Sequence, residues 1–391
     1  MSVVLQHSKY IADDALIYSI LDQAMVNDYA ISLWRLPGSA KKSLIICETP
    51  LTIDDVSIEE LPTGFVISPF DTKKKKIFLK ADQVFEFENG TLSHSVSTEQ
   101  VEELRESATS NAKPRFHSRP LFNSNSIKEA YLSLVEKAIN LIASNAVEKL
   151  VPSRSKRIAL DSSFDLVNQF GKLCDAYPNA FVSLISTPDT GTWLGASPEL
   201  IISVDGQMKF RTTAVAGTQR FDPDTDLRAV AWTQKEIEEQ ALVSRYIINC
   251  FKKIRLREFG EHGPKTWKAG NLLHLKTDFE VDMNATNFPQ LGSVMLKLLH
   301  PTSAICGMPR EESIEFILQN EGMDRGLYSG YLGPINYKGE SNLFVNLRCM
   351  QWSNSEAELY AGAGVTIDSI PEAEWEETEM KMNTLLKVIE K

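Results

Sequence analysis

The chain has 391 residues, 43% of them hydrophobic, and its 41 basic and 52 acidic residues give a formal net charge of -11. That length allows one large domain or two to three ordinary ones, and the acidic balance disfavours nucleic acid or an anionic membrane as the main partner. Five cysteines without close spacing form neither a disulfide framework nor a zinc pattern, and no apolar run has membrane-spanning length, so we expect a soluble, cytoplasmic protein.

Residues 1–115 predict a strand-rich region without recognisable chemistry. Short apolar segments such as Ile31–Leu36 and Ser43–Cys47 are broken there by Pro, Gly and Asp. The polar stretch Ser107–Pro114 is the best candidate for a boundary or long loop. We therefore divide the chain into residues 1–115, expected to be part of the same fold, and residues 116–391.

The second region begins with a predicted helix over residues 126–144. Ser126 precedes apolar residues at helical spacing, and Glu129 completes a capping box. Strand patterns follow at residues 148–160, 180–186, 200–204, 208–216, 330–337, 342–352 and 357–365. Helical patterns recur at residues 228–258 and 287–299, then at 310–321 and at the acidic C-terminal segment. Asp205-Gly206 signals a hairpin, and hairpins with helices between them predict an α+β fold of antiparallel sheets flanked by helices.

Two residues are candidates for acid–base chemistry. Lys149 opens the strand at residues 148–160, and it can act as a general base if burial and neighbouring cations favour its neutral form. Glu199 lies between Pro198 and the apolar Leu200–Ile202, where desolvation would make it an acid. The alternatives are a surface lysine at a strand edge and a solvent-facing glutamate at a strand start.

A pair of acidic helical segments, far apart in the sequence, predicts a cation site. Glu236 and Glu239 are three residues apart, as are Glu374 and Glu377, so each pair shares one helix face. Four carboxylates at one spot repel each other unless a cation lies between them, and ligation by oxygen alone suits Mg²⁺. The alternative is that both segments are solvated helix faces.

Polar residues in apolar surroundings are candidates for substrate binding. Arg348 lies within a predicted strand, where a charge is costly unless paired, and a guanidinium suits a bidentate carboxylate. An internal salt bridge is the alternative for Arg348, and packing roles are the alternatives for Tyr328 and His274. Gly362 and Gly364 leave the main chain open to close approach by a ligand, or they form a tight bend.

Together, these segments form an ordered set between residues 120 and 391. In sequence order they are Glu148–Arg154, Leu194–Leu200, Ala214–Thr218, Lys235–Gln240, Leu272–Leu275, His300–Pro309, Arg325–Gly330, Arg348, Ala361–Gly364 and Glu374–Lys381. The set resembles the chorismate-utilising enzymes, and within them most closely the isochorismate synthases of menaquinone or siderophore supply. Residues 1–115 carry no comparable signature.

The resemblance implies a single large chorismate-binding domain with the fold of anthranilate synthase component I, and it assigns roles by position. Lys149 would activate water for attack at C2 of chorismate, and Glu199 would protonate the departing C4 hydroxyl. The metal would be Mg²⁺, bound by Glu239 and Glu377, with Glu236 and Glu374 holding metal-bound waters. The substrate-binding positions implied are Gly217, Thr218, His274, Thr302, Tyr328, Arg348, Gly362, Gly364 and Lys381, of which Arg348, Tyr328 and Lys381 would hold the enolpyruvyl group.

The choice of nucleophile follows from two positions. In this family, water-using members have a lysine at position 149, whereas the anthranilate synthases resemble the pattern with glutamine there and take ammonia. Ala216 stands where aminodeoxychorismate synthase has a nucleophilic lysine. Water is therefore the expected nucleophile, and no glutaminase subunit is expected. The protein is expected to be a monomer or homodimer. The alternatives are a salicylate synthase, which goes on to eliminate pyruvate, and a catalytically silent relative that binds chorismate, or pairs with a partner subunit, without turnover.

Three residues depart from the family pattern. Gln240 replaces a histidine after the metal glutamate, and it keeps a hydrogen-bonding side chain but cannot carry a positive charge. Glu236 replaces a common aspartate. Pro152 replaces an aliphatic residue and removes a ladder donor, which predicts an edge strand or a bulge.

Overall fold

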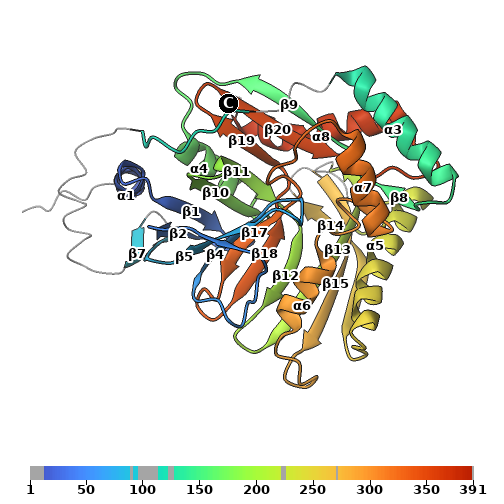
Figure 1. Ribbon diagram of the computed structural model, residues 1–391, viewed down its shortest axis with the longest axis horizontal. Coiled ribbons are helices and arrows are strands. Elements are labelled where there is room, and N and C mark those ends of the chain that lie inside the picture. Colours follow the sequence, from blue (N-terminus) through green and yellow to red (C-terminus); the bar gives the residue numbers. More distant parts are fainter. Residues whose placement is uncertain are drawn as a thin grey trace, which may run out of the picture.

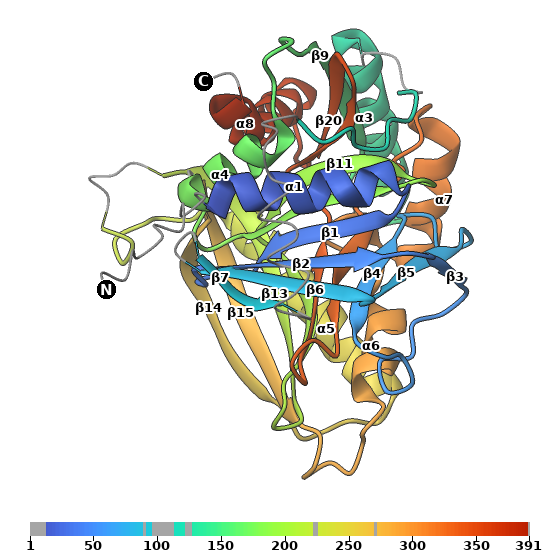
Figure 2. The same cartoon turned by 90° about the vertical axis from the view of Figure 1, so that its left-hand side faces the viewer.

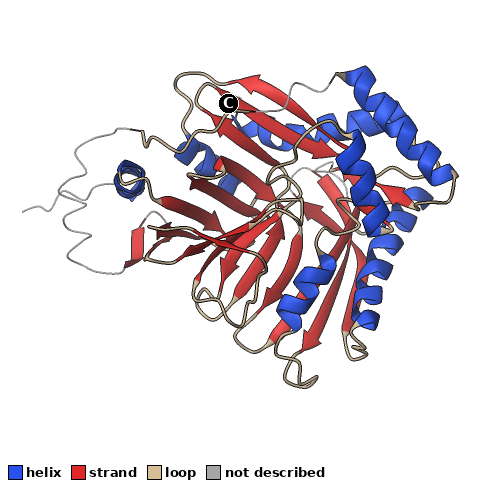
Figure 3. Cartoon of the chain, in the orientation of Figure 1, coloured by secondary structure: helices blue, strands red, loops and turns tan. Residues whose placement is uncertain are grey.

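The protein folds into four layers, with helices on the two outer faces and two antiparallel sheets between them (Figure 1). The structure is a computed structural model, and it describes residues 13–88, 91–95, 113–121, 127–221, 226–269 and 272–389. Figure 3 shows how helices and strands segregate into these layers. This architecture confirms the expected α+β class of antiparallel sheets flanked by helices.

The sheets combine strands from distant parts of the chain. Sheet A has the order β7 (Thr91–Ser95), β6 (Gln83–Glu88), β2 (Lys41–Cys47), β1 (Ala30–Arg35), β10 (Phe181–Thr187), β11 (Gly191–Ser197), β19 (Cys349–Ser353), β20 (Glu356–Gly362) and β9 (Ser153–Ala159). Sheet B has the order β14 (Gly260–Ala269), β15 (Leu272–Asp282), β13 (Lys209–Arg220), β12 (Leu200–Val204), β18 (Ser341–Val345), β17 (Tyr331–Ile335), β4 (Gly64–Ser68), β5 (Lys76–Lys80) and β3 (Leu51–Ile53). A small third sheet pairs β8 (Lys149–Leu150) with β16 (Gly307–Met308).

Five of the helices described cover the outer faces of the two large sheets. The bounds of all the described helices are α1 (Asp13–Val26), α3 (Lys128–Ala143), α4 (Leu166–Ala176), α5 (Gln234–Lys253), α6 (Leu291–Leu299), α7 (Arg310–Asn320) and α8 (Pro371–Ile389). Helices α1, α4 and α8 pack on sheet A, as the turned view shows (Figure 2), and α5 and α6 pack on sheet B. Helix α3 instead packs on α8 and β8, and α7 packs on β16. No helix in the part of the chain that the structure describes combines the length and apolarity needed to cross a membrane.

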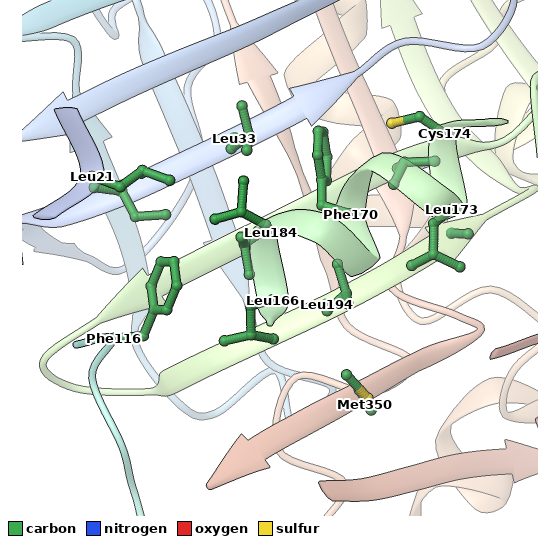
Figure 4. Packing of buried hydrophobic residues seen from close by; sticks show 14 of the residues in the cluster. Leu21, Leu33, Phe116, Leu166, Phe170, Leu173, Cys174, Leu184, Leu194 and Met350 are labelled. Carbon is green, nitrogen blue, oxygen red and sulfur yellow. The ribbon is translucent and has the colours of Figure 1, made fainter. Parts of the chain in front are cut away.

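Alternating side chains along the strands build separate cores on the two faces of each sheet. In β10, Val182 and Leu184 face the helices, whereas Phe181 and Ile185 face sheet B. Figure 4 shows the cluster on the helix side, where Leu184 lies near Phe170 of α4. Both faces of β10 are thus buried, and its polar positions are small serine and threonine residues.

Most of the predicted elements are confirmed, with shifted bounds. The helix expected at 126–144 is α3, although its N-cap is Ile127 without a side-chain cap bond, and Ser126 lies outside the described residues. The Asp205-Gly206 hairpin joins β12 to β13. Pro152 falls between β8 and β9, and β9 is an edge strand of sheet A, as expected for a residue that donates no ladder bond.

Two strand predictions are wrong at positions that matter for function. The pattern at residues 148–160 predicts a single strand, but the chain forms β8 in the small third sheet and β9 in sheet A. The pattern at residues 342–352 predicts a single strand, but the chain forms β18 in sheet B and β19 in sheet A. Arg348 lies in the connection, with a left-handed φ of 48° that a strand does not allow. The chain crosses from one sheet to the other at Arg348, and this places its side chain between them.

Candidate active site

A pocket between the two sheets collects most of the predicted site residues. We call it the central pocket, and its lining comprises Val151, Pro198, Glu199, Val215, Ala216, Gly217, Thr218, Glu239, His274, Ala304, Ile305, Tyr328, Leu347, Arg348, Gly362, Glu377 and Lys381. Strands β13 and β15 of sheet B, β20 of sheet A and helices α5 and α8 all contribute to it. Residues from at least five segments therefore converge on one small volume.

A larger cavity, of about 720 Å³, opens elsewhere between the sheets, but it lacks this chemistry. Its lining cations already have partners, since Lys74 pairs with Asp324 at 2.7 Å, Lys75 pairs with Asp54, and Arg119 Nε donates to the Pro188 carbonyl. We assign the chemistry to the central pocket because it is there that acid, base and metal-suited groups meet.

Lys149 is absent from the lining of the central pocket but lies next to it, held by an ion pair with the lining residue Glu239. Its side chain is 1% exposed, and its Nζ lies 2.7 Å from Glu239 Oε1. The backbone of Lys149 is fixed because its strand, β8, pairs with β16, where Lys149 lies opposite Met308. Burial opposes ionisation of Glu239, but the neighbouring Lys149 outweighs this effect and lowers the pKa of the carboxyl.

The other three predicted metal-site glutamates also have partners. Glu377 forms an ion pair of 2.6 Å with Lys381 one helical turn later, and Glu374 pairs with Lys235 at 2.7 Å. Glu236 completes a capping box with Thr233 at the start of α5. Glu239 and Glu377 line the central pocket, whereas Glu236 and Glu374 are absent from its lining.

The donor set suits Mg²⁺, although no cluster is preformed. Among the described residues, no group of three or more His, Cys, Asp or Glu side chains is close enough to hold a metal ion. Carboxylate oxygens are nevertheless the ligands that Mg²⁺ prefers, and water completes its octahedral shell where the protein supplies only one or two. Glu239 and Glu377 would be the direct ligands, since both face the pocket.

Glu199 has the environment of a proton donor. It is 6% exposed, and Thr302 Oγ1 donates a bond of 3.3 Å to its Oε1. Desolvation raises the pKa of Glu199 from its usual 4.5 to about 7, even though Thr302 and the cations of the pocket act in the opposite direction. A carboxyl with this pKa keeps a substantial protonated fraction at neutral pH, as a general acid requires.

Arg348 presents an unpaired guanidinium to the pocket. Throughout the described ranges, no acceptor bonds to its side chain, while its carbonyl accepts a bond from the Ala196 amide. Burial lowers the pKa of Arg348, and Glu377 and Glu199 are among the groups that oppose this shift. The internal salt bridge considered from the sequence is not present among these residues, and this favours a role in binding a carboxylate.

His274 offers a hydrogen-bond acceptor in the same pocket. It is 5% exposed, and its Nδ1 lies 2.7 Å from the Gly217 carbonyl, so Nδ1 carries the proton and donates. Its Nε2 is buried without a partner among the described residues. Burial, followed by Arg348, lowers the pKa of His274 to about 3, and the imidazole is therefore neutral with Nε2 free to accept.

Gly362 and Gly364 are required by the side chains around them. A Cβ at Gly364 would meet Glu239 Oε1 and would lie 3.1 Å from Lys149 Cε. A Cβ at Gly362 would lie 2.5 Å from Ser153 Oγ and 3.2 Å from the Tyr328 hydroxyl. Both glycines thus make room for the residues proposed to act, and Gly362 also lines the pocket directly.

The remaining predicted positions divide into two groups. Gly217, Thr218, Tyr328 and Lys381 line the central pocket. Thr302 is absent from the lining and instead donates a hydrogen bond to Glu199. The structure therefore brings the predicted substrate residues together except for Thr302 and Gly364, which contact the catalytic candidates rather than the open space.

Sequence reasoning missed the apolar wall of the pocket and the partner of Glu374. The apolar wall consists of Val215, Ile305 and Leu347. Each lies within or next to a sequence motif, and this position is the signal by which the sequence could have identified it. Lys235 lies immediately before Glu236, but its ion pair joins residues 139 positions apart, and no local pattern predicts such a pair.

Comparisons with known proteins agree with this geometry. A family model described as "Chorismate binding enzyme" matches residues 68–390. The isochorismate synthase EntC of Escherichia coli (strain K12) is 30% identical over 260 residues, which are 65% of this chain and 66% of EntC. The match thus spans slightly less than two thirds of that relative.

Solved structures extend the likeness to nearly the whole chain. MenF, the menaquinone-specific isochorismate synthase from Escherichia coli, superposes with a TM-score of 0.75 at 20% identity, covering 98% of this chain and 92% of that one. Anthranilate synthase component I from Streptococcus pneumoniae TIGR4 gives a TM-score of 0.68 at 18% identity, covering 91% and 89%. The chain therefore belongs to the family of chorismate binding enzymes and has the fold of MenF and of anthranilate synthase component I.

Proposed function

We propose that this protein is an isochorismate synthase that converts chorismate to isochorismate with Mg²⁺. The observation that carries the proposal is one pocket lined by a carboxyl with raised pKa and by two further carboxylates, one of which is ion-paired to a buried lysine. The name of the relative EntC supports the same activity. These groups match the needs of a reaction that adds water at one ring carbon and removes a hydroxyl from another.

The reaction exchanges one hydroxyl for another across the ring. Water attacks C2 of chorismate and the ring double bonds shift. The C4 hydroxyl then departs as water, so substrate and product are isomers. Lys149, once neutral, takes the proton from the attacking water, and Glu199 gives its proton to the leaving hydroxyl. The pKa of Glu199, about 7, allows it both to donate this proton and to recover it near neutral pH.

The charge of the substrate requires cations at two places. Glu239 and Glu377 would hold Mg²⁺, whose positive charge when bound would stabilise the ring carboxylate. Arg348, with no partner for its side chain among the described residues, would bind the enolpyruvyl carboxylate, with Tyr328 and Lys381 beside it. The free Nε2 of His274 would accept a hydrogen bond from a substrate hydroxyl.

The nucleophile in this proposal is water rather than ammonia. Lys149 can remove a proton from water, whereas the glutamine of ammonia-using relatives has no basic nitrogen. Ala216 lines the pocket without a nucleophilic group. We therefore expect a cytoplasmic enzyme that works without a glutaminase subunit.

The test is to incubate the purified protein with chorismate, with and without Mg²⁺, and to separate the products by liquid chromatography over time. Isochorismate that forms only with Mg²⁺, in a mixture that stops short of completion, is the expected result. Salicylate with pyruvate would instead identify a salicylate synthase. Chorismate that stays unchanged, while Mg²⁺-dependent chorismate binding is measured, would contradict the proposed activity and favour a silent binder.

A further inference from the structure

A buried ion pair lies next to the residues that line the central pocket. Glu321 is the C-cap residue of α7, and Arg325 follows it four positions later. Their side chains are only 1% and 2% exposed. Arg325 Nε donates a bond of 2.8 Å to Glu321 Oε2, and its Nη2 donates to Oε1. The guanidinium carbon lies 4.3 Å from the centre of the Phe70 ring, so both the position and the plane of the guanidinium are fixed.

The same guanidinium binds two main-chain carbonyls of the pocket wall. Arg325 Nη2 donates a bond of 2.8 Å to the carbonyl of Val151, and Nη1 donates one of 2.9 Å to that of Ile305. Both residues line the central pocket. Glu321 Oε1 in turn accepts a bond of 2.8 Å from the Ser153 amide. The ion pair therefore joins two stretches of pocket wall that are far apart in the sequence.

Each of these two stretches is connected to one of the proposed catalytic residues. Lys149 lies two positions before Val151, and the strand that carries it pairs only two residues with β16. Thr302, which donates a bond to Glu199, accepts one of 3.0 Å from the amide of Ile305. A ladder of two residue pairs leaves its two chains free to twist. The guanidinium adds a second, rigid connection between the stretch that carries the base and the stretch that holds the acid.

We propose that Arg325, held in place by Glu321, is a positioning residue that sets the separation of Lys149 from Glu199. The proposal rests on the proposed function, because it takes these two residues as the base and the acid. Arg325 is absent from the lining of the central pocket, and it acts through the two carbonyls that it binds. Stability alone is a weak reason for such a pair, since apolar groups of similar volume often stabilise a fold equally well.

The double variant Glu321→Gln/Arg325→Met tests the positioning role in the full chain. It replaces the ion pair by uncharged side chains of similar volume, so urea unfolding should give a free energy close to that of the parent. Its kcat for chorismate should fall about 100-fold, the typical cost of misplacing a catalytic group by about 1 Å. A folded double variant with the kcat of the parent would overturn the proposal.

The Michaelis constant separates positioning from a general disturbance of the pocket. KM of the double variant should stay within about threefold of the parent, because the described contacts of Arg348 and Lys381, which would bind the substrate, include neither member of the ion pair. A KM that rises as much as kcat falls would show that the whole pocket has loosened, and it would refute a role confined to base and acid.

The variant Arg325→Lys separates the shape of the guanidinium from its charge. Lysine keeps the ion pair with Glu321, but its ammonium is a point charge without the planar fork that binds two carbonyls. We expect a folded protein whose kcat is about tenfold or more below that of the parent. An unchanged kcat would refute the role of the guanidinium. Because both charges remain, this variant decides the question even where the double variant does not fold.

The matched control is Lys338→Met/Glu86→Gln. It removes an ion pair of 2.7 Å that also contains a buried glutamate, and neither residue lines the central pocket. Its kcat should equal that of the parent, and an equal loss of kcat in the control would refute a specific role of Arg325. A parent protein that does not convert chorismate would refute the proposed function itself. An active parent whose Arg325→Lys and double variants keep its kcat would refute the positioning role alone.

Discussion

Replacing Glu199 by glutamine should stabilise the substrate-free protein at alkaline pH while it abolishes turnover. Glu199 is 6% exposed, and desolvation raises its pKa from the usual 4.5 to about 7. Between these two values the unfolded chain releases a proton that the folded chain retains. The free energy of unfolding of the parent therefore falls as the pH rises from 4.5 through about 7.

The size of the effect follows from the gap between the two pKa values. Each pH unit of that gap is worth about 1.4 kcal/mol, so burying ionised Glu199 costs roughly 3 kcal/mol above pH 7. Glutamine has a similar shape and no charge, and Glu199→Gln escapes this cost. The difference in unfolding free energy between Glu199→Gln and the parent should therefore grow by about 2.5 kcal/mol from pH 5 to pH 8.

Urea unfolding of both proteins at several pH values between 5 and 8 measures this difference. Other titrating groups cancel, because they are shared by the two proteins. Glu258→Gln, which changes an exposed carboxylate, is the matched control for the substitution itself. A flat difference for Glu199→Gln would refute the argument that desolvation makes Glu199 an acid, and with it the role of Glu199 as proton donor.

Four further outcomes follow from the site. The kcat/KM of the parent should fall as the pH rises through about 7, because the acid form of Glu199 is lost, and a pH–rate profile measures this. Lys149→Ala should abolish turnover but retain Mg²⁺-dependent chorismate binding in equilibrium dialysis, and retained turnover would contradict its role as base. Arg348→Met should raise KM by about 10 to 100-fold, which corresponds to the free energy of one hydrogen bond to a charged group. Its thermal stability should not fall, because the guanidinium has no partner among the described residues. Gly364→Ala should lower kcat about 100-fold by displacing Lys149 and Glu239, whereas normal kinetics would show that the pair tolerates the methyl group.

The sequence predicts regular elements better than the turns between them. Alternating apolar residues predict β1, β2, β10, β12 and β13. Helix α4 was not predicted, although Asp165 caps it by accepting bonds from Val167 N and Asn168 N. Its short length gave too few helical repeats to stand out from the surrounding polar residues. The β14–β15 hairpin was missed for a related reason, because polar residues follow each other along β14 and hide its strand pattern.

The site was predictable as a set of residues but not as a set of contacts. Glu239 and Glu377 do face one pocket, and Lys149 does lie beside them. The ion pair of Glu239, however, joins it to Lys149 across 90 positions, and helical spacing says nothing about such a partner. Only the pair of Glu377 with Lys381, one helical turn apart, follows from helical spacing. Helical spacing alone makes Glu236 and Glu374 equivalent to Glu239 and Glu377. In the structure, however, Glu236 caps α5 together with Thr233, and Glu374 pairs with Lys235. The catalytic and metal-binding roles themselves stay predictions.

The placement of Arg348 explains why such a site lies between two sheets and not on one. A pocket for a dianion needs cations that are not already neutralised, and a buried arginine inside a strand is costly unless it is paired, as Arg154 of β9 is with Glu379 of α8. Here the chain leaves sheet B after β18, turns at Arg348 and enters sheet A as β19. Because Arg348 lies in this turn, its side chain belongs to the face of neither sheet. Glu199 and Glu377 lie near enough to favour the charged form of Arg348, although neither accepts a hydrogen bond from its guanidinium. The turn between β18 and β19, which the sequence pattern does not predict, is therefore the feature that leaves the Arg348 guanidinium available to the substrate.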